Sequence, residues 1–297
     1  MSQAQTPKKQ IKKVGIITKR NIISNKALLK KLVEYLKKKK KQVIFDTNAT
    51  QVYKDEQGHK KSEILRKADL VLVLGGDGTL LKTARRLSRH KVLILPVNLG
   101  NLGFLTEAMP EKIFETLDKV FKNQYYTDRR SLLRVTVYRN SKKFHTSLAL
   151  NDTVINQGAF ARLIKMHLAI DDRKLVRFRG DGLIISTPTG STAHSLSAGG
   201  PIVHPMVEGL LITPMNPISL SMRPIMVPLD KTVSVTIDTQ RREDTPLIGL
   251  TIDGQEMLVL HYGDKVHFRH SKRYLYIVRT RNRYYQMLRS KLHWGEA

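Results

Sequence analysis

The chain contains no cysteine among its 297 residues. Disulfide bonds and thiolate metal sites are therefore excluded, and the composition is typical of a protein from a reducing compartment. No apolar run approaches the ~18 residues of a membrane span, and the first residues lack the apolar stretch of a signal peptide. We therefore expect a cytoplasmic protein without membrane contact, in which residues 1–10 form a disordered basic leader.

Acidic residues are scarce: 25 Asp and Glu stand against 52 Lys and Arg, which gives a formal net charge of +27. Such a charge attracts polyanions, including nucleotides, polyphosphate and nucleic acid. The basic residues are nevertheless spread along the chain. Their densest run, 37–41, falls at the end of an expected helix, where cations interact favourably with the helix dipole. A solvated basic surface and a functional polyanion partner are both compatible with this pattern.

Several common catalytic patterns are also missing. The sequence has neither a Walker A motif nor a Gly-x-Gly-x-x-Gly fingerprint. It has no Gly-x-Ser-x-Gly elbow, so serine-hydrolase chemistry of that kind has no support. The ten histidines do not include a His-Glu-x-x-His arrangement, which argues against a zinc site.

The first part of the chain alternates short apolar runs with amphipathic segments. The run 70–74 reads Leu-Val-Leu-Val-Leu, which is typical of a parallel strand buried on both faces. In 25–40 the apolar residues recur at helical spacing. This rhythm predicts an open, Rossmann-like α/β domain over residues 1–128. The expected strands are 14–18, 43–45, 70–74 and 92–97, and the expected helices are 25–40, 79–88 and 111–122.

Short strands dominate from residue 131 onward, separated by turn signals such as Asp253-Gly254. Their density predicts a β-sandwich domain over residues 129–280. The tail is expected to be helical over 282–294, within a final segment 281–297. The expected strands are 132–138, 146–150, 163–170, 175–178, 183–186, 225–227, 233–237, 247–252, 257–260, 266–269 and 274–278.

The segment Gly75-Gly76-Asp77-Gly78-Thr79 follows a buried strand and precedes a helix. Glycines at the carboxyl end of such a strand let the backbone approach a phosphate, and the helix N-terminus favours negative charge there. Asp77 is the loop's only carboxylate, so it could accept a proton from a hydroxyl or face a magnesium ion. The alternative is a plain glycine-rich turn capped by Thr79. The loop therefore predicts phosphoryl transfer to a hydroxyl group.

Two further loops offer polar groups. Residues 98–106 follow the next buried strand, where Gly100 and Gly103 allow close backbone approach and Phe104 could flank a base. An ordinary turn leading to the next helix is the alternative. The pair Asn151-Asp152 places an amide beside a carboxylate, which suits a vicinal diol such as that of ribose. A strand-end turn explains this dipeptide as well.

A long stretch of small and hydroxyl residues follows Arg179-Gly180-Asp181-Gly182. Residues 187–201 read Thr-Pro-Thr-Gly-Ser-Thr-Ala-His-Ser-Leu-Ser-Ala-Gly-Gly-Pro. Such a composition cannot form a packed core strand, but it offers backbone amides and hydroxyls to a polar ligand. A flexible Ser/Gly linker is the alternative, and the rigid Pro188 and Pro201 argue against it.

These four motifs, in this order, resemble those of the NAD kinase family. The Gly-Gly-Asp-Gly-Thr loop alone is less specific, because diacylglycerol kinases, sphingosine kinases and phosphofructokinases carry similar loops. Residues 181–201 are the specific part, and the resemblance extends from about residue 14 to 294. It implies an α/β domain followed by a β-sandwich domain, a tail (281–297) that packs back on the first domain, and a homotetramer or homodimer.

The resemblance also implies a reaction: transfer of phosphate from ATP, another nucleotide or polyphosphate to the 2′-hydroxyl of the adenosine ribose of NAD, producing NADP. It implies a divalent metal, most simply magnesium, without a dedicated protein metal site. NAD and ATP would be the partners, with no specific nucleic acid. Asp77 would accept the hydroxyl proton. The implied binding residues are Asp77, Gly78, Lys82, Asn151, Asp152, Arg162, Arg179, Asp181, Thr192, Ala193, His194, Ser195, Leu196, Ser197 and Gln255.

Three departures from the family pattern concern the details of ligand geometry. Many members have Glu at the position of Asp152, Tyr at that of His194, and Gly-Ile-Asn where this chain has Pro96-Val97-Asn98. Two other functions are alternatives. A lipid or sugar kinase would need an apolar cleft or a sugar-phosphate clamp. A non-catalytic polyanion binder would bind nucleic acid with a steep salt dependence, but no helix-turn-helix or RNA-recognition signature supports it.

Overall fold

The computed structural model describes residues 10–100, 103–157, 163–239 and 248–293. The chain divides into two compact units. Unit 1 comprises residues 1–129 and 275–297, and unit 2 comprises residues 130–274. Unit 1 is therefore built from both ends of the chain, and unit 2 from its middle.

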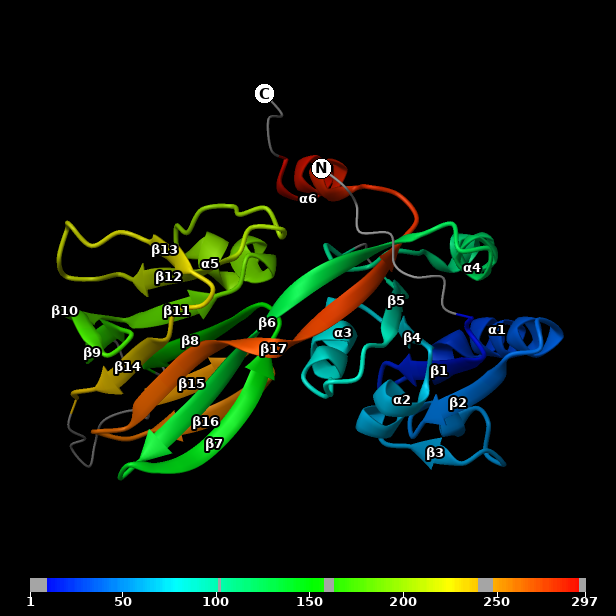
Figure 1. Cartoon of the computed structure of the whole chain (residues 1–297), viewed down its shortest axis with the longest axis horizontal. Helices are drawn as coiled ribbons and strands as arrows, with labels where there is room; N and C mark the ends of the chain where they lie inside the picture. Colours follow the sequence, from blue (N-terminus) through cyan, green and yellow to red (C-terminus); the bar gives the residue numbers. More distant parts are fainter. Residues whose placement is uncertain (1–9, 101–102, 158–162, 240–247, 294–297) are drawn as a thin grey trace. The chain divides into compact units, whose positions relative to one another are not determined.

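Unit 1 contains a sheet with the strand order β17-β5-β4-β1-β2-β3 (Figure 1). All neighbouring strands in this order run parallel. The last residues of β17 join this sheet by pairing Tyr276 with Leu93 and Ile277 with Ile94. The strands are β1 (Lys13–Thr18), β2 (Gln42–Asp46), β3 (Gly58–His59), β4 (Leu70–Leu74), β5 (Leu93–Val97) and β17 (Lys265–Arg279).

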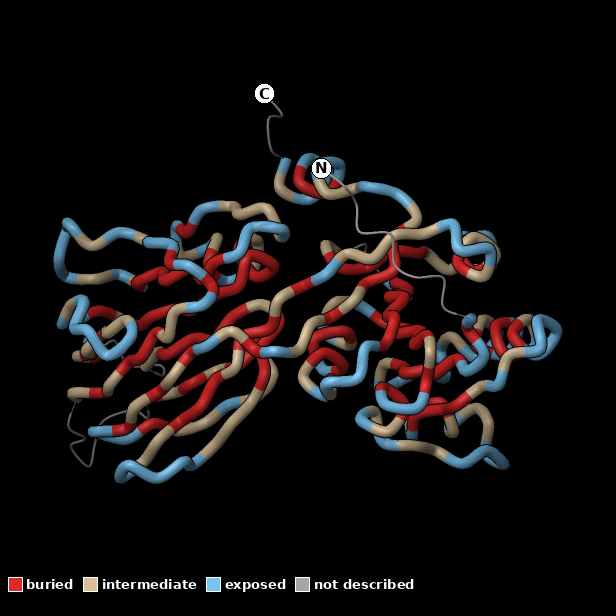
Figure 2. The backbone as a smooth tube through the Cα atoms, in the orientation of Figure 1, coloured by how far each residue is buried: buried red, intermediate tan, exposed pale blue. Residues whose placement is uncertain are grey.

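Apolar runs and helical periodicity explain these elements. Every residue of β4 and β5 is buried, as expected for central parallel strands (Figure 2). Helix α1 buries Leu29, Leu32 and Leu36 on one face. The helices of unit 1 are α1 (Lys26–Lys38), α2 (Lys61–Lys67), α3 (Asp77–Ala84), α4 (Ile113–Phe121) and α6 (Tyr284–Leu292), with 3₁₀ helices at Ile23–Asn25, Ala49–Gln51 and Pro110–Lys112.

Unit 2 consists of two layers of β-strands. One sheet has the order β13-β12-β11-β8-β15-β16, with all pairs antiparallel. The other joins β10-β9-β14-β17, and β6 pairs with both β17 and β7. One apolar core contains Ile155 and Ile212 from the first sheet and Leu168 and Phe268 from the second. Side chains from both inner faces thus form a β-sandwich.

The strands of this sandwich are short, apart from β6 and β17, which each run through both units. Between β11 and β12 the chain forms a 3₁₀ helix and the one-turn helix α5. The bounds are β6 (Tyr126–Arg139), β7 (Lys142–Ala149), β8 (Asp152–Gln157), β9 (Ile164–Ile170), β10 (Arg173–Gly180), β11 (Gly182–Ser186), the 3₁₀ helix (Thr189–Thr192), α5 (His194–Ser197), β12 (Gly209–Met215), β13 (Ile225–Pro228), β14 (Val233–Ile237), β15 (Ile248–Ile252) and β16 (Glu256–Leu260).

The predicted fold class, an α/β domain followed by a β-sandwich, is confirmed. Several element predictions are corrected. The strands expected at 266–269 and 274–278 are one strand, β17: the polar stretch between them stays extended and buries Ser271, although the buried positions change there from even to odd residue numbers. The helix expected from 79 begins at Asp77 and ends at Ala84. Strands β8 and β12 and helix α2 were not predicted at all. No helix in the described part of the chain is long and apolar enough to span a membrane.

Candidate functional site

Asp77 lies where β4 passes into α3 in unit 1 (Figure 1). Gly76 is the N-cap of α3, and Asp77 is its first residue. The Gly75 N–H donates to the carbonyl of Val97 at the end of β5, which fixes the loop against the neighbouring strand. A carboxylate and the positive end of a helix dipole therefore meet at the carboxyl edge of a parallel sheet, a position typical of nucleotide sites.

The two carboxylate oxygens of Asp77 have different surroundings. Oδ2 accepts a hydrogen bond from the Phe104 N–H at 3.1 Å. Oδ1 is buried and has no hydrogen-bond partner among the described residues. Burial raises the pKa of Asp77, opposed by the amides of Leu105 and Phe104 and by the positive charge of Arg279 and Lys291. A raised pKa and an unpartnered oxygen suit a group that accepts a proton from a ligand.

Gly103 packs directly against this carboxylate. A Cβ at position 103 would lie 2.3 Å from Asp77 Oδ1 and 2.5 Å from Cγ. Such distances are far below van der Waals contact, so any side chain here would displace the Asp77 carboxylate. The absence of a side chain at Gly103 thus makes room for the Asp77 carboxylate, whereas the sequence suggested that the backbone there approaches a ligand. Residues 101 and 102 of this loop lie outside the described residues.

A buried ion pair fixes the far end of the same loop. Arg279 donates to Glu107 Oε2 at 3.2 Å and to the carbonyl of Thr106 at 3.0 Å. The side chain of Glu107 is almost fully buried, and its Oε1 accepts from the backbone N–H and the hydroxyl of Thr280. Arg279 also donates to Asp128. The C-terminal part of the chain therefore holds the loop that carries the Asp77 hydrogen bond.

The other predicted residues of unit 1 lie on the same helix. Gly78 and Lys82 are exposed on α3, one turn apart. Burial lowers the pKa of Lys61, and the nearby positive charges of Lys82 and Arg86 lower it further. Cationic side chains therefore gather on this part of unit 1, as a site for phosphate groups requires.

In unit 2, the Asn151-Asp152 pair lies between β7 and β8, and Asp152 is the first residue of β8. The pair thus occupies the turn that follows β7, and it also opens a central strand that pairs with both β11 and β15. The Asp152 carboxyl is buried, and Oδ1 of Asn151 has no hydrogen-bond partner among the described residues. Asn151 therefore carries an acceptor atom that the described protein groups do not use.

Asp152 titrates in an unusual environment. Burial, reinforced by the negative charge of Asp253, raises the pKa of Asp152 from 3.8 to about 7, and the backbone N–H of His194 opposes this shift. This contact with the His194 N–H places the first residue of α5 beside Asp152. The structure thus brings together two of the predicted segments of unit 2, the Asn151-Asp152 pair and the 187–201 stretch.

The 187–201 stretch is ordered by its own hydroxyl groups, which rules out a flexible linker. The Ser191 hydroxyl donates to the carbonyl of Pro188 at 2.7 Å and accepts from the Val203 N–H at 3.0 Å. The hydroxyl of Ser195 is fully buried and bonds with Thr213 at 2.9 Å. Ser195 can therefore offer a ligand its backbone only. The remaining predicted residues of this stretch are partly or fully exposed: Thr192, Ala193, His194, Leu196 and Ser197.

The last predicted residues lie in other parts of unit 2. Asp181 accepts a hydrogen bond from the side chain of Asn216 at 2.8 Å. Gln255 is half-buried in the turn between β15 and β16. Arg162 lies outside the described residues. Arg179 is exposed near the end of β10, at the edge of a cavity.

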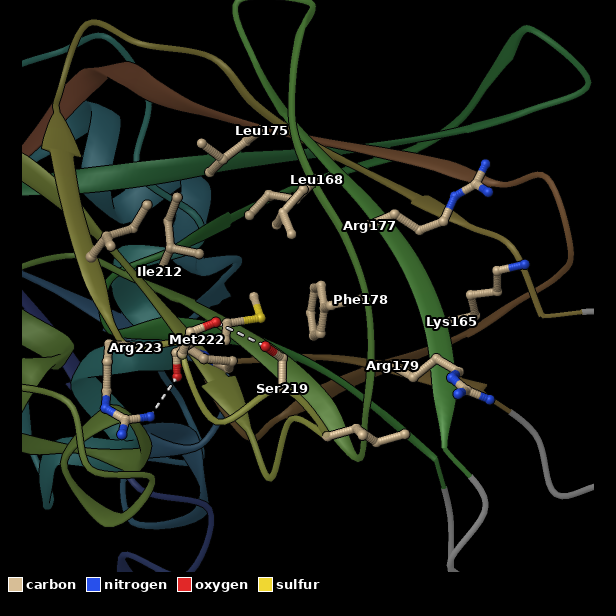
Figure 3. Close-up of a pocket in the computed structure, with 15 residues that line it drawn as sticks. Lys165, Leu168, Leu175, Arg177, Phe178, Arg179, Ile212, Ser219, Met222 and Arg223 are labelled. Carbon is tan, nitrogen blue, oxygen red and sulfur yellow. Dashed lines mark hydrogen bonds between the residues drawn. The ribbon is translucent and has the colours of Figure 1, made fainter.

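This cavity of about 580 Å³ lies in unit 2, between β9–β10 and the β12–β13 segment (Figure 3). The side chains of Leu168, Phe178, Ile212 and Met222 surround it, and that of Arg177 points away from it. Neither Asn151 nor Asp152 lines it. Its apolar walls do not resemble a binding site for phosphates. Arg179 lines this cavity, but none of the other predicted site residues does.

The described residues contain no cluster of three or more His, Cys, Asp or Glu side chains that could hold a metal ion. The unpartnered Asp77 Oδ1 is one free carboxylate oxygen at a helix N-terminus. One oxygen does not make a dedicated metal site, so the residues present fit a magnesium ion that would be held mainly by substrate phosphates and water.

Sequence reasoning missed the residues that hold the predicted ones in place. Arg279 and Asp253 contact the backbone of the two loops from positions about 100 or more residues away, and Glu107 binds Arg279 and the Thr280 N–H. Only Asp253 had a local signal, the Asp-Gly turn before Gln255, and that signal indicated a turn and nothing more.

Comparisons with known proteins agree with this geometry. Residues 14–125 match the family model of the ATP-NAD kinase N-terminal domain, and residues 150–280 match that of the ATP-NAD kinase C-terminal domain. An NAD kinase of Geotalea daltonii is 38% identical over 287 residues, which cover 96% of this chain and 100% of the relative. An NAD kinase of Syntrophotalea carbinolica is 39% identical over 96% of this chain and 100% of the relative.

Solved structures show the same fold. The crystal structure of yeast NADH kinase complexed with NADH superposes with a TM-score of 0.88 at 26% identity, covering 98% of this chain and 90% of that chain. An NAD kinase from Archaeoglobus fulgidus in complex with ATP has a TM-score of 0.71 at 23% identity, covering 95% of this chain and 98% of that chain, and supports the fold alone. With both family domains matched and full-length relatives at this identity, the chain belongs to the NAD kinase family of phosphotransferases.

Proposed function

We propose that this protein transfers the γ-phosphoryl group of ATP to the 2′-hydroxyl of the adenosine ribose of NAD, producing NADP. The observation that carries the proposal is Asp77: a buried carboxylate with a raised pKa and one unpartnered oxygen, at the N-terminus of α3. The similarity to NAD kinases over 96% of the chain supports the choice of acceptor.

In the proposed reaction the ribose hydroxyl oxygen forms a bond to the γ-phosphorus while the bond from that phosphorus to the β–γ bridging oxygen breaks. ADP leaves, and Asp77 accepts the hydroxyl proton. Phosphoryl transfer depends mainly on alignment and charge neutralisation. The N-terminal amides of α3, Arg279 and Lys291 supply positive charge near Asp77, and Lys82 adds an exposed cation on the same helix.

Magnesium, held mainly by the phosphate oxygens of ATP, would neutralise charge on the donor when bound. The chain itself supplies the alignment. Asn151 and Asp152 are proposed to hold ribose hydroxyls through Oδ1 of Asn151 and the Asp152 carboxyl. With a pKa of about 7, Asp152 is present in both protonation states near neutral pH, so it can donate or accept such a hydrogen bond. His194, Leu196 and Gln255 are proposed to complete the dinucleotide contacts.

The decisive experiment is a coupled NADP assay with NAD, ATP and magnesium on the wild type and on Asp77→Asn. The variant keeps the shape of the side chain and should fold and bind NAD, but lose most of its turnover, because the amide cannot accept the proton. Near wild-type turnover of the folded variant would disprove the base role.

A substrate panel separates this function from the related kinases. NAD, NADH, diacylglycerol and fructose 6-phosphate are offered with ATP, and ATP and polyphosphate are compared as donors with NAD. We expect turnover with a nicotinamide dinucleotide only. Turnover with the lipid or the sugar phosphate, and none with NAD, would contradict the proposed acceptor.

We further propose that the active protein is a homo-oligomer in which a second copy covers the apolar cavity of unit 2. Large apolar side chains are exposed at its rim, including Leu175, Ile218 and Ile225. Such a contiguous patch is typical of interfaces. Sedimentation should give a mass above the 33.9 kDa of one chain. Ile218→Glu should shift it towards the monomer, and Met257→Glu, at a more exposed position away from the cavity, should not; a monomeric wild type would refute the proposal.

A further inference from the structure

The Asp253 carboxylate lies beneath the Asn151-Asp152 turn in unit 2. Its Oδ1 accepts from the Asn151 N–H at 2.8 Å and from the Asp152 N–H at 3.3 Å. The Leu150 N–H lies 3.1 Å from Oδ1 and 3.0 Å from Oδ2. In return, the Asp253 N–H donates to the carbonyl of Asp152 at 2.9 Å. Three successive amides thus converge on one buried carboxylate, an arrangement that holds a backbone turn around an anion.

The opposite side of this turn is held by the start of the 187–201 stretch. The carbonyl of Asn151 accepts from the Thr187 N–H at 2.8 Å, and that of Leu150 accepts from the Thr187 hydroxyl at 2.6 Å. Gly190 leaves no room for movement, since a Cβ there would lie 2.2 Å from the carbonyl oxygen of Asn151. The amides and carbonyls of the turn are therefore all occupied, and the side chains of Asn151 and Asp152 are what remain for a ligand.

We propose that Asp253 is a positioning residue for the acceptor nucleoside: its carboxylate fixes the backbone of Asn151 and Asp152 so that their side chains meet the ribose hydroxyls. Asp253 itself is buried, so it acts through the turn. This role rests on the function proposed above.

The chemistry of the contact explains why an aspartate stands here. Three amide donors need a group that only accepts hydrogen bonds, and an ionised carboxylate offers about four lone-pair sites for them. The position also has a φ of +50°, which Asp and Asn tolerate better than most residues. The Asp253 carboxylate also places a negative charge close to Asp152, and this charge raises the pKa of Asp152. A purely structural turn would not require a second buried acid at this place.

The test compares Asp253→Asn with Asp264→Asn in the full-length protein. Asparagine fits the backbone at position 253, but its NH₂ group cannot accept a hydrogen bond, so the three amides lose part of their anchor. The KM for NAD should rise about tenfold or more, while the KM for ATP and kcat at saturating NAD stay within about threefold. Asp264 is a matched control, since it is equally buried in another turn of unit 2 and binds Arg139 and the His261 N–H.

The control variant should lose thermal stability without a selective rise in the KM for NAD. An unchanged KM for NAD in Asp253→Asn, or the same rise in Asp264→Asn, would overturn the positioning role. If Asp253→Asn fails to fold, Thr187→Val takes its place, because it releases the carbonyl of Leu150 from the other side of the turn. It should also raise the KM for NAD, and an unchanged KM would count against the proposal.

These outcomes are separable from a failure of the proposed function. A wild type without NAD phosphorylation would refute the acceptor assignment itself. A wild type that phosphorylates NAD, together with an Asp253→Asn variant of normal KM, would leave the function intact and reject the role of Asp253 alone.

Discussion

The position of the Asp77 carboxylate depends on Gly103, for which the sequence predicted only a close backbone approach. Position 103 has space for a hydrogen only, because a Cβ would overlap all three atoms of the Asp77 carboxylate group. The Phe104 N–H that binds Oδ2 is the next amide along the chain. The loop therefore fixes the carboxylate sterically and by a hydrogen bond, which is how a proton acceptor is held in a productive geometry.

Gly103→Ala should lower kcat by about 100-fold, since a displacement on the order of 1 Å is enough for such a loss. Its matched control is Gly100→Ala in the same loop, where a Cβ meets nothing within 4 Å. Both variants should melt within a few degrees of the wild type. Coupled NADP assays of the three proteins check this prediction, and equal activity of the two variants would contradict the close packing of Gly103 on Asp77.

The pH dependence of stability should show the raised pKa of Asp152. The folded protein holds this proton up to about pH 7, whereas the unfolded chain releases it near 3.8. Its contribution to stability is therefore complete below about pH 4 and is lost as the pH rises to about 7. Asp152→Asn has no charge to bury. Its melting temperature should therefore rise relative to that of the wild type as the pH increases from about 4 to about 7.

The exposed Asp171 provides a control of opposite sign. Its pKa is lowered by the Thr232 N–H and by Lys231, so its contribution is present at neutral pH and is lost in acid. Asp171→Asn should therefore lose stability relative to the wild type as the pH rises. Melting curves of the three proteins between about pH 2 and pH 8 check both signs, since the Asp171 contribution changes below about pH 4 and that of Asp152 changes above it. Parallel curves for Asp152→Asn and the wild type would contradict the buried, protonated state.

The sequence predicted the residues proposed to contact the substrates better than the residues that hold those residues in place. Asp77 and the Asn151-Asp152 pair stand out because polar groups follow apolar strands, which is a local pattern. Asp253 and Glu107 have no such pattern around them. Their importance comes from contacts with backbone groups more than 100 residues away, and only the fold reveals these contacts.

At the scale of elements, continuous apolar runs were predicted best. The runs 14–18 and 70–74 became β1 and β4, because a fully buried parallel strand needs no polar alternation. Strand β12 (Gly209–Met215) was missed although six of its seven residues are buried; it contains a glycine and a proline, which are uncommon in strand interiors. Strand β8 was missed because Asp152 opens it, and the burial of a carboxyl group follows from the tertiary structure.

The C-terminal part of β17 is held to the 103–107 loop by a buried ion pair. Glu107→Ala should destabilise unit 1 by about 3 kcal/mol, since it removes a buried acceptor of Arg279 and of the Thr280 N–H and leaves Asp128 as the remaining carboxylate partner of Arg279. Glu111→Ala removes an exposed glutamate a few residues away and should change stability by less than about 0.5 kcal/mol. Urea unfolding followed by circular dichroism checks both values, and similar losses in the two variants would contradict a specific role of the pair.

At the scale of the whole molecule, the order of the chain explains how distant segments contribute to one unit. Residues 275–297 belong to unit 1 with residues 1–129, so the last strand of the sandwich continues into the parallel sheet. A prediction that divides a sequence into consecutive domains cannot anticipate this return. It could be expected here only from the resemblance to NAD kinases.

The net charge of +27 also acts on the molecule as a whole. Like charges repel over roughly 10 Å at 0.1 M salt, and this self-repulsion opposes the compact state. Raising sodium chloride from about 0.02 M to about 0.2 M shortens that range, so the melting temperature should rise by a few degrees. Exposed ion pairs such as Lys39–Asp118 act in the opposite direction, but each is worth at most about 1 kcal/mol.

Lys38→Glu, which replaces an exposed cation with an anion in the last turn of α1, lowers the net charge and serves as the comparison. The rise of its melting temperature with added sodium chloride should be smaller than that of the wild type. A melting temperature that falls with salt in both proteins would show that local ion pairs outweigh the overall repulsion. Tight binding of duplex DNA at about 0.2 M salt, without NADP formation by the wild type, would instead favour a polyanion-binding function for the charge.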